Sequence, residues 1–249
     1  MTPDPDGRRS YARTVMGLPV SIHLRGEYDR GRELRALRRC WADLRLADRL
    51  FSTYRVDSQI ERLNRGELAL SDADPLVREV LSLADRAAAM TAGTFDVRYS
   101  GRLDPSGIVK GWAAARAAEH LRALRADFYL NAGGDMVVHS DGSPWRVGVE
   151  HPAAPTGLIA VLSLRNGAVA TSGRAHRGAH IVNPLTGRPA SGLAQVTVVG
   201  PDLVWADVYA TALVAGGSEH PSWQWPDGYA FLAVTDDGDV MTTAGWPGE

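Results

Sequence analysis

The chain has 249 residues, which is enough for one large domain or two small domains with a sizeable core. Its net charge of -2 at pH 7 lacks the basic excess of a nucleic-acid-binding protein. Cys40 is its one cysteine, which excludes an intramolecular disulfide and a multi-cysteine zinc or iron–sulfur site.

The N-terminal residues are polar. Residues 1–10 are rich in proline, aspartate, glycine and arginine, so we expect a disordered lead-in followed by a single domain over 11–249. This region lacks the apolar segment of a signal peptide, and no later apolar run reaches the roughly 18 residues of a membrane-spanning helix. We therefore expect a cytoplasmic protein with no membrane span.

The spacing of apolar residues predicts interleaved helices and strands. Helices are predicted over 27–50, from Ser58, and over 75–91, 109–125 and 203–217. Strands are predicted over 11–24, 128–140, 145–152, 157–173, 194–201 and 229–245, with hairpin turns at Asn166-Gly167 and Asp237-Gly238. The irregular order and the hairpins favour an α+β fold with mixed or antiparallel sheets over a doubly wound parallel sheet.

The stretch from Thr91 to Trp112 is too polar and too rich in glycine for a core element. It contains a glycine turn that ends in Asp96, followed by a turn that opens a helix after Asp104. Backbone amides at a helix start attract an anion, and Lys110 would reach a phosphate if it faced the same site. The alternative is a helix capped by Asp104 with a solvated lysine, and a loose glycine pattern does not decide between the two.

The predicted helix over 203–217 is mostly apolar, so we expect it to be buried. It nevertheless carries Asp207 and Thr211, which are four residues apart and therefore lie on one face. A buried carboxylate needs a partner, and a hard cation such as Mg²⁺ binds carboxylate, hydroxyl and carbonyl oxygens. The alternative is a carboxylate near the helix start with a threonine that bonds back to its own helix.

Three further segments give weaker signals. His176 and His180 with a single cysteine form no zinc pattern. Ser172 offers a hydroxyl, but no histidine and acid at known geometry support a serine nucleophile. The turn before Asp135 would bring backbone close to a ligand that Asp135 orients, or would form a β-bulge at a strand entry.

Eight short segments occur in an order that is more informative than each segment alone: TVMG, FSTY, GTFDV, LDPSGIVKGW, NAGGD, ATSG, HIVNPLTG and ADVYATAL. This series, which runs from about Thr14 to Gly217, resembles the ApbE family of FAD:protein FMN transferases. The segments NAGGD, HIVNPLTG and ADVYATAL are the most specific of the eight.

The resemblance implies an α+β fold with T-fold-like layers, in which sheets and helices surround a central FAD cleft. It also implies an enzyme that uses Mg²⁺ to cleave the pyrophosphate of FAD, its substrate. FMN would pass to a threonine or serine hydroxyl of a partner flavoprotein, and AMP would leave. By matching position, FAD would contact Met16, Tyr54, Thr94, Phe95, Asp96, Asp104, Lys110 and Ile181. Mg²⁺ would be held by Asp207, Thr211 and a backbone oxygen of Gly107.

The catalytic residues implied in this way are Lys110 and Asp207, together with a base that accepts the proton of the acceptor hydroxyl. His180 is the first candidate for the base and His176 is the alternative. Two other functions keep the same site. An FAD pyrophosphatase would give FMN and AMP by transfer to water, and an FAD-binding protein would hold the dinucleotide without turnover.

The chain departs from the family pattern at several positions. The usual LGGIAKG reads PSGIVKG, in which Pro105 fixes a backbone angle and removes an amide donor. Ala115 replaces a frequent aspartate, Asn183 replaces the aspartate of HIIDP, and Leu18 replaces a threonine after MG. Asp207 and Thr211 are unchanged.

Overall fold

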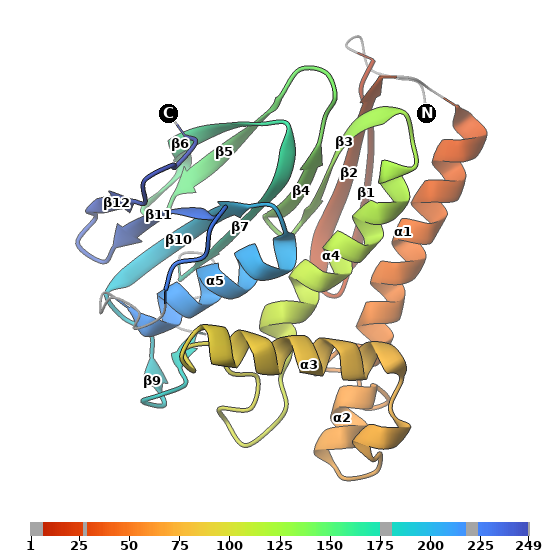
Figure 1. The fold of residues 1–249 in the computed structure, drawn as a ribbon. Helices are drawn as coiled ribbons and strands as arrows, with labels where there is room; N and C mark the ends of the chain where they lie inside the picture. Colours follow the sequence, from red (N-terminus) through yellow and green to blue (C-terminus); the bar gives the residue numbers. More distant parts are fainter. Residues whose placement is uncertain (1–6, 27–28, 175–180, 218–223, 249) are drawn as a thin grey trace.

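The computed structural model describes residues 7–26, 29–174, 181–217 and 224–248 (Figure 1). Its largest element is an eight-stranded sheet in the order β1-β2-β3-β4-β7-β10-β11-β12, in which every neighbouring pair is antiparallel. The strands of this sheet are β1 (Arg9–Val15), β2 (Leu18–Gly26), β3 (Ala126–Ala132), β4 (Asp135–His139), β7 (Asn166–Gly173), β10 (Leu193–Gly200), β11 (Ala230–Thr235) and β12 (Val240–Thr242).

The helices are α1 (Arg30–Phe51), α2 (Gln59–Asn64), α3 (Pro75–Met90), α4 (Ser106–Arg122) and α5 (Leu203–Gly216), with a short 3-10 turn, η1, at Leu70–Asp72. Helices α1, α4 and α5 lie on one face of the sheet, and α2 and α3 lie below them in the view of Figure 1. Helix α4 packs between α1 and α5, while α5 lies on β7 and β10. The helices and this face of the sheet share one hydrophobic core, so side chains from α4 and α5 meet above the middle of the sheet.

The opposite face of the sheet is covered by a two-stranded sheet of β5 (Trp145–His151) and β6 (Ala154–Leu164). Alternate residues of both strands pack on β4, β7, β10 and β11 to form a second core. A separate small hairpin of β8 (Val182–Asn183) and β9 (Arg188–Pro189) lies beside the end of α5. The molecule therefore has three layers, and the predicted α+β class with antiparallel sheets is confirmed.

Several local predictions are confirmed by hydrogen bonds. The Ser58 hydroxyl accepts from the Glu61 amide at the start of α2, as expected of a capping residue. Gly133 and Gly134 do interrupt the strand predicted over 128–140, but that segment is a hairpin of β3 and β4: both φ angles are positive, at 63° and 105°, which is the geometry of a two-residue turn. Cys40 is buried and its thiol donates to the Ala117 carbonyl; burial raises the pKa of this thiol to about 12.

Three predictions about element boundaries are wrong. Strand β1 begins at Arg9, a residue expected in the disordered lead-in, because its buried guanidinium pairs with Glu33 of α1 at 2.9 Å. Helix α4 begins at Ser106, not at residue 109, since the Asp104 carboxylate accepts from the Ser106 amide at 3.0 Å.

The third correction concerns the predicted hairpin over 157–173 with its turn at Asn166-Gly167. Strand β6 pairs with β5, whereas β7 begins at Asn166 and lies between β4 and β10. Gly167 is required there by packing: a Cβ at this position would lie 2.8 Å from the Gly200 carbonyl oxygen. In the described part of the chain, no helix combines the length and apolar character needed to cross a membrane.

Candidate active site

The candidate site lies where α4 and α5 approach each other most closely. Two glycines one turn apart on α4 face the pair on α5: a Cβ on Gly111 would lie 3.2 Å from the Asp207 Cβ, and a Cβ on Gly107 would lie 3.9 Å from the Thr211 methyl group. The Gly111 amide donates to Asp207 Oδ2 at 3.2 Å. The absence of side chains at these two positions lets the backbone of α4 contact the polar face of α5.

Lys110 reaches into this contact from α4. Its Nζ lies 2.6 Å from Asp135 Oδ2 and 3.5 Å from Asp207 Oδ1. Both carboxylates are about 1% exposed as residues, whereas 22% of the lysine side chain remains exposed. Two buried carboxylates thus share one ammonium, and the cluster carries an excess negative charge if all three groups are ionised.

The pKa values in this cluster follow from burial and from the shared charge. Burial raises the pKa of Asp207 to about 7; the nearby Lys110 ammonium acts against this and the Asp135 carboxylate adds to it. Burial by itself would lower the pKa of Lys110, but Asp207 and Asp135 outweigh it and raise that pKa above its ordinary value. Lys110 therefore stays positively charged. The charge of Asp207 is only partly balanced, because Asp207 shares the Lys110 ammonium with Asp135.

Hydroxyl groups extend the site on the sheet side. Thr211 Oγ1 lies 2.9 Å from Ser172 Oγ of β7, so the sheet holds the threonine hydroxyl next to Asp207. The turn after α3 closes the other side. Phe95 is buried, and its ring would lie 3.1 Å from a Cβ on Gly107. The Thr94 methyl group would lie 3.5 Å from a Cβ on Gly216, near the end of α5.

The structure therefore brings together six of the residues predicted from sequence, from three separate segments. They are Thr94, Phe95, Gly107, Lys110, Asp207 and Thr211. The i,i+4 spacing on α5 identified Asp207 and Thr211, and their placement against Gly107 and Lys110 agrees with that hypothesis.

The other predicted contacts surround this cluster less closely. Met16 occupies the β1–β2 turn with a positive φ of 55°, at the end of the sheet where Leu18 would contact a Cβ on Gly133. Tyr54 is 96% exposed. The remaining predicted residues bond locally: Asp96 accepts from the Arg98 amide, Asp104 accepts from Ser106, and the buried Ile181 accepts from the Ala190 amide. His176 and His180 lie outside the described residues.

Sequence reasoning did not assign two side chains that the structure places in the site. Asp135 was expected to orient a ligand or to follow a bulge, and it instead contacts Lys110 from the start of β4. Ser172 was weighed as a nucleophile, and it instead holds the Thr211 hydroxyl. An acidic residue directly after a glycine turn marks Asp135 as a candidate in the sequence. The sequence does not show that its partner is Lys110, because the two residues are distant in the chain.

The residues present fit a hard divalent cation. In the described part of the chain, no three acidic, histidine or cysteine side chains are arranged to hold a metal. Mg²⁺, however, is commonly bound through one or two carboxylates together with waters and substrate phosphates. That requirement is met here by the buried Asp207 carboxylate, whose charge Lys110 balances only in part, by the Thr211 hydroxyl, and by the nearby α4 backbone at Gly107.

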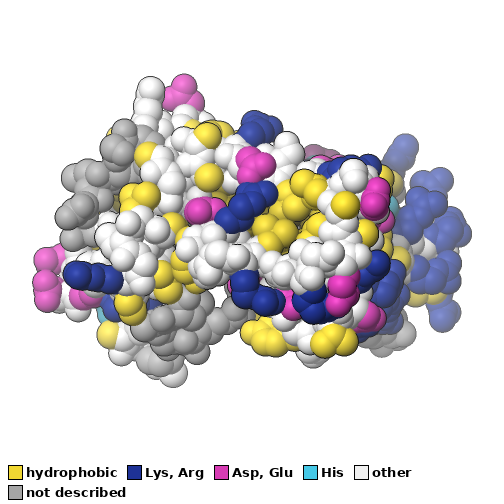
Figure 2. Space-filling view, turned by 90° about the horizontal axis from the view of Figure 1, so that it is seen from below, with side chains coloured by type: hydrophobic (Ala, Val, Ile, Leu, Met, Phe, Trp, Pro, Cys, Tyr) yellow, Lys and Arg dark blue, Asp and Glu magenta, His cyan; other side chains and the backbone are white. Residues whose placement is uncertain are grey.

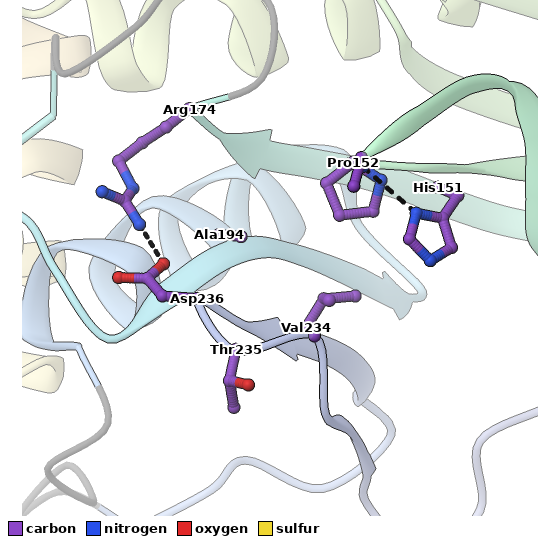
Figure 3. Close-up of a pocket in the computed structure, with 9 residues that line it drawn as sticks. His151, Pro152, Arg174, Ala194, Val234, Thr235 and Asp236 are labelled. Atoms are coloured by element: carbon purple, nitrogen blue, oxygen red, sulfur yellow. Dashed lines mark hydrogen bonds and ion pairs between the residues drawn. The ribbon is translucent and has the colours of Figure 1, made fainter.

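The face of the molecule that is seen from below is hollowed near its middle, where hydrophobic, basic and acidic side chains lie close together (Figure 2). A separate cavity of about 250 Å³ lies between the β5–β6 turn and the ends of β7, β10 and β11. Val234 and Ala194 line it, with the Arg174–Asp236 ion pair on one side and His151 on the other (Figure 3). This cavity contains none of the residues predicted for the site.

Comparison with known proteins identifies the family. The model of the ApbE family matches residues 16–101 and 98–225. The chain belongs to the ApbE family. The FAD:protein FMN transferase of Rhodobacter capsulatus is 34% identical over 192 residues, which are 69% of this chain and 36% of that protein. The protein of the same name from Escherichia coli K12 is 28% identical over 156 residues, which are 57% of this chain and 44% of the relative.

Solved structures of ApbE proteins share the fold. The ApbE protein of Thermotoga maritima superposes with a TM-score of 0.83 at 21% identity, and the match covers 95% of this chain and 97% of that one. The flavin transferase ApbE of Vibrio cholerae also gives 0.83 at 21% identity, covering 97% and 99%. By sequence, in contrast, the matched stretches span less than half the length of the curated relatives from Rhodobacter capsulatus and Escherichia coli K12.

Proposed function

We propose that this chain is a Mg²⁺-dependent FAD:protein FMN transferase. The observation that carries the proposal is the polar face of α5, where Asp207 and Thr211 lie one helical turn apart against Gly107 and Lys110 of α4. Relatives that bear this name belong to the same family. FAD is the proposed substrate, and the FMN acceptor is a threonine or serine hydroxyl of a partner flavoprotein.

Each residue of the cluster has a distinct role in this proposal. Lys110 binds the pyrophosphate of FAD as a fixed positive charge, and the N-terminal end of α4 adds partial positive charge beside it. Asp207, Thr211 and the Gly107 carbonyl would hold Mg²⁺, which when bound neutralises charge on the bridging phosphates. Phosphoryl transfer depends mainly on such positioning and charge neutralisation.

The transfer replaces one phosphorus–oxygen bond with another. The acceptor oxygen bonds to the phosphorus of the FMN half, the bond to the bridging oxygen breaks, and AMP leaves with that oxygen. The hydroxyl proton passes to a base, for which His180 and His176 are the candidates from sequence. Flavin and ribose contacts are proposed for the other predicted residues, which are Met16, Tyr54, Thr94, Phe95, Asp96, Asp104 and Ile181. A cytoplasmic location stays a prediction.

Incubation with FAD and Mg²⁺, with and without a candidate acceptor protein, tests the proposal. The expected result is AMP together with an acceptor whose mass increases by one FMN and which keeps flavin fluorescence on a denaturing gel. FMN and AMP without labelled acceptor would indicate a pyrophosphatase, and bound FAD without AMP would indicate a binding protein. Asp207→Asn should abolish AMP release, whereas Asp127→Asn, which alters a carboxylate paired with Arg25 on another part of the sheet, should not.

A further inference from the structure

We propose that Asp135 is a positioning residue that holds the Lys110 ammonium away from Asp207, so that Asp207 is free to bind the divalent cation. This inference rests on the proposed function, since it assumes that Asp207 is a metal ligand. It assigns a role to the aspartate of the NAGGD segment, which lies on strand β4, whereas the proposed metal ligands lie on helices α4 and α5.

The distances favour Asp135 as the main partner of the lysine. Lys110 Nζ is 2.6 Å from Asp135 Oδ2 but 3.5 Å from Asp207 Oδ1. Because the attraction between opposite charges falls with distance, the closer carboxylate holds the ammonium more tightly. Asp207 is paired with Lys110 at a longer distance, which leaves it available to bind another cation.

Asp135 is itself held rigidly. It is the first residue of β4 and follows the two-residue turn at Gly133-Gly134. Its other oxygen, Oδ1, accepts from the Thr171 amide of the neighbouring β7 at 3.2 Å. Only 1% of the residue is exposed, so the carboxylate is enclosed by the protein. The position of the Lys110 charge is thus determined by the sheet and not by α4 alone.

Without the Asp135 charge, Asp207 would be the one carboxylate among the described residues that still pairs with Lys110. An ammonium at full contact with Asp207 would occupy the position that a divalent cation needs and would repel it. Lys110 is consequently a competitor of the metal ion that Asp135 keeps in place, and we expect most of the effect of Asp135 on metal affinity to depend on Lys110.

A double-mutant cycle tests this dependence directly. Mg²⁺ is titrated by calorimetry into the full metal-free chain at pH 8, without FAD or acceptor, for the wild type, Asp135→Asn, Lys110→Met and the double variant. Asparagine keeps the shape of the side chain and an oxygen for the Thr171 amide. Asp127→Asn, which removes a carboxylate from an ion pair on β3, is the matched control. Thermal unfolding verifies that each variant is folded.

We expect Asp135→Asn to weaken Mg²⁺ binding roughly tenfold or more, as for other residues that orient ligands. In the Lys110→Met background the same change should have less than about a threefold effect. Lys110→Met alone should bind Mg²⁺ at least as tightly as the wild type, and this variant decides the question if Asp135→Asn does not fold.

Three results would overturn the inference. They are an unchanged affinity in Asp135→Asn, an equal loss with and without Lys110, and weaker Mg²⁺ binding in Lys110→Met. A wild-type chain that binds no Mg²⁺ would instead refute the metal site of the proposed function, so the two failures are distinguishable.

Discussion

Replacing Asp207 with asparagine should stabilise the metal-free protein at high pH while it removes the proposed metal site. The substitution keeps the shape of the side chain and leaves an oxygen for the Gly111 amide. Removing one member of a buried ion pair is usually destabilising, because the partner charge is left alone. Here two carboxylates share Lys110, so the variant retains a balanced pair of Lys110 and Asp135.

The magnitude follows from the raised pKa of Asp207, which is about 7 in the folded chain, compared with the ordinary value of 3.8 expected in the unfolded chain. The folded state holds this proton more tightly than the unfolded state, so the stability that protonated Asp207 contributes is complete below pH 3.8 and is lost as the pH rises to about 7. The whole difference corresponds to about 4 kcal/mol at most. Because the raised pKa already includes the attraction to Lys110, we expect a gain of about 2–4 kcal/mol at pH 8.

Urea unfolding at pH 5 and pH 8, with chelator or with Mg²⁺, measures this prediction. At pH 5, which lies between the two pKa values of Asp207, only part of this stability has been lost, so the gain should be smaller than at pH 8. Mg²⁺ at a hundred times its dissociation constant should stabilise the wild type by about 2.7 kcal/mol and should not stabilise the variant.

Asp127→Asn is the control with the opposite sign. Burial acts to raise the pKa of Asp127, but hydrogen bonds from Ser140 and Arg25 lower it below its ordinary value. The stability from this charge is present above pH 3.8 and lost as the pH falls further, so the control should lose stability at both pH 5 and pH 8. An Asp207→Asn variant that also lost stability, and lost more at pH 8 than at pH 5, would refute the reasoning.

Two further substitutions probe the walls of the site. Gly111→Ala should destabilise the chain by about 1–2 kcal/mol in urea unfolding, because its Cβ would lie 3.0 Å from the Leu203 carbonyl oxygen and this overpacking outweighs the better helix propensity; equal or greater stability would contradict the close contact of α4 and α5. Tyr54→Ala should change stability by less than about 0.5 kcal/mol since the side chain is 96% exposed, yet weaken FAD binding in a fluorescence titration. Val56→Ala, on a nearby residue that is 77% exposed, should change neither, and unaltered FAD binding in Tyr54→Ala would remove that residue from the site.

Local patterns in the sequence were sufficient for features that depend on near neighbours. The i,i+4 spacing of Asp207 and Thr211 determines that they share a face of α5, since helix geometry alone sets that relation. Ser58 with Glu61, and the adjacent glycines before Asp135, likewise determine a helix start and a tight turn through the conformations their own side chains allow or lack. The family resemblance rested on the order of such segments.

Relations between distant segments were decided only by the tertiary structure. Asn166-Gly167 has the composition of a hairpin turn, but it opens a central strand because Gly167 must pack against Gly200. The contact of Lys110 with Asp135 joins residues 25 positions apart. The need for glycine at Gly107 and Gly111 is likewise evident only in the structure, where α5 packs closely against them. Periodicity reports which side of an element is buried, whereas the partner of a buried charge depends on how whole elements pack, and packing is a property of the complete chain.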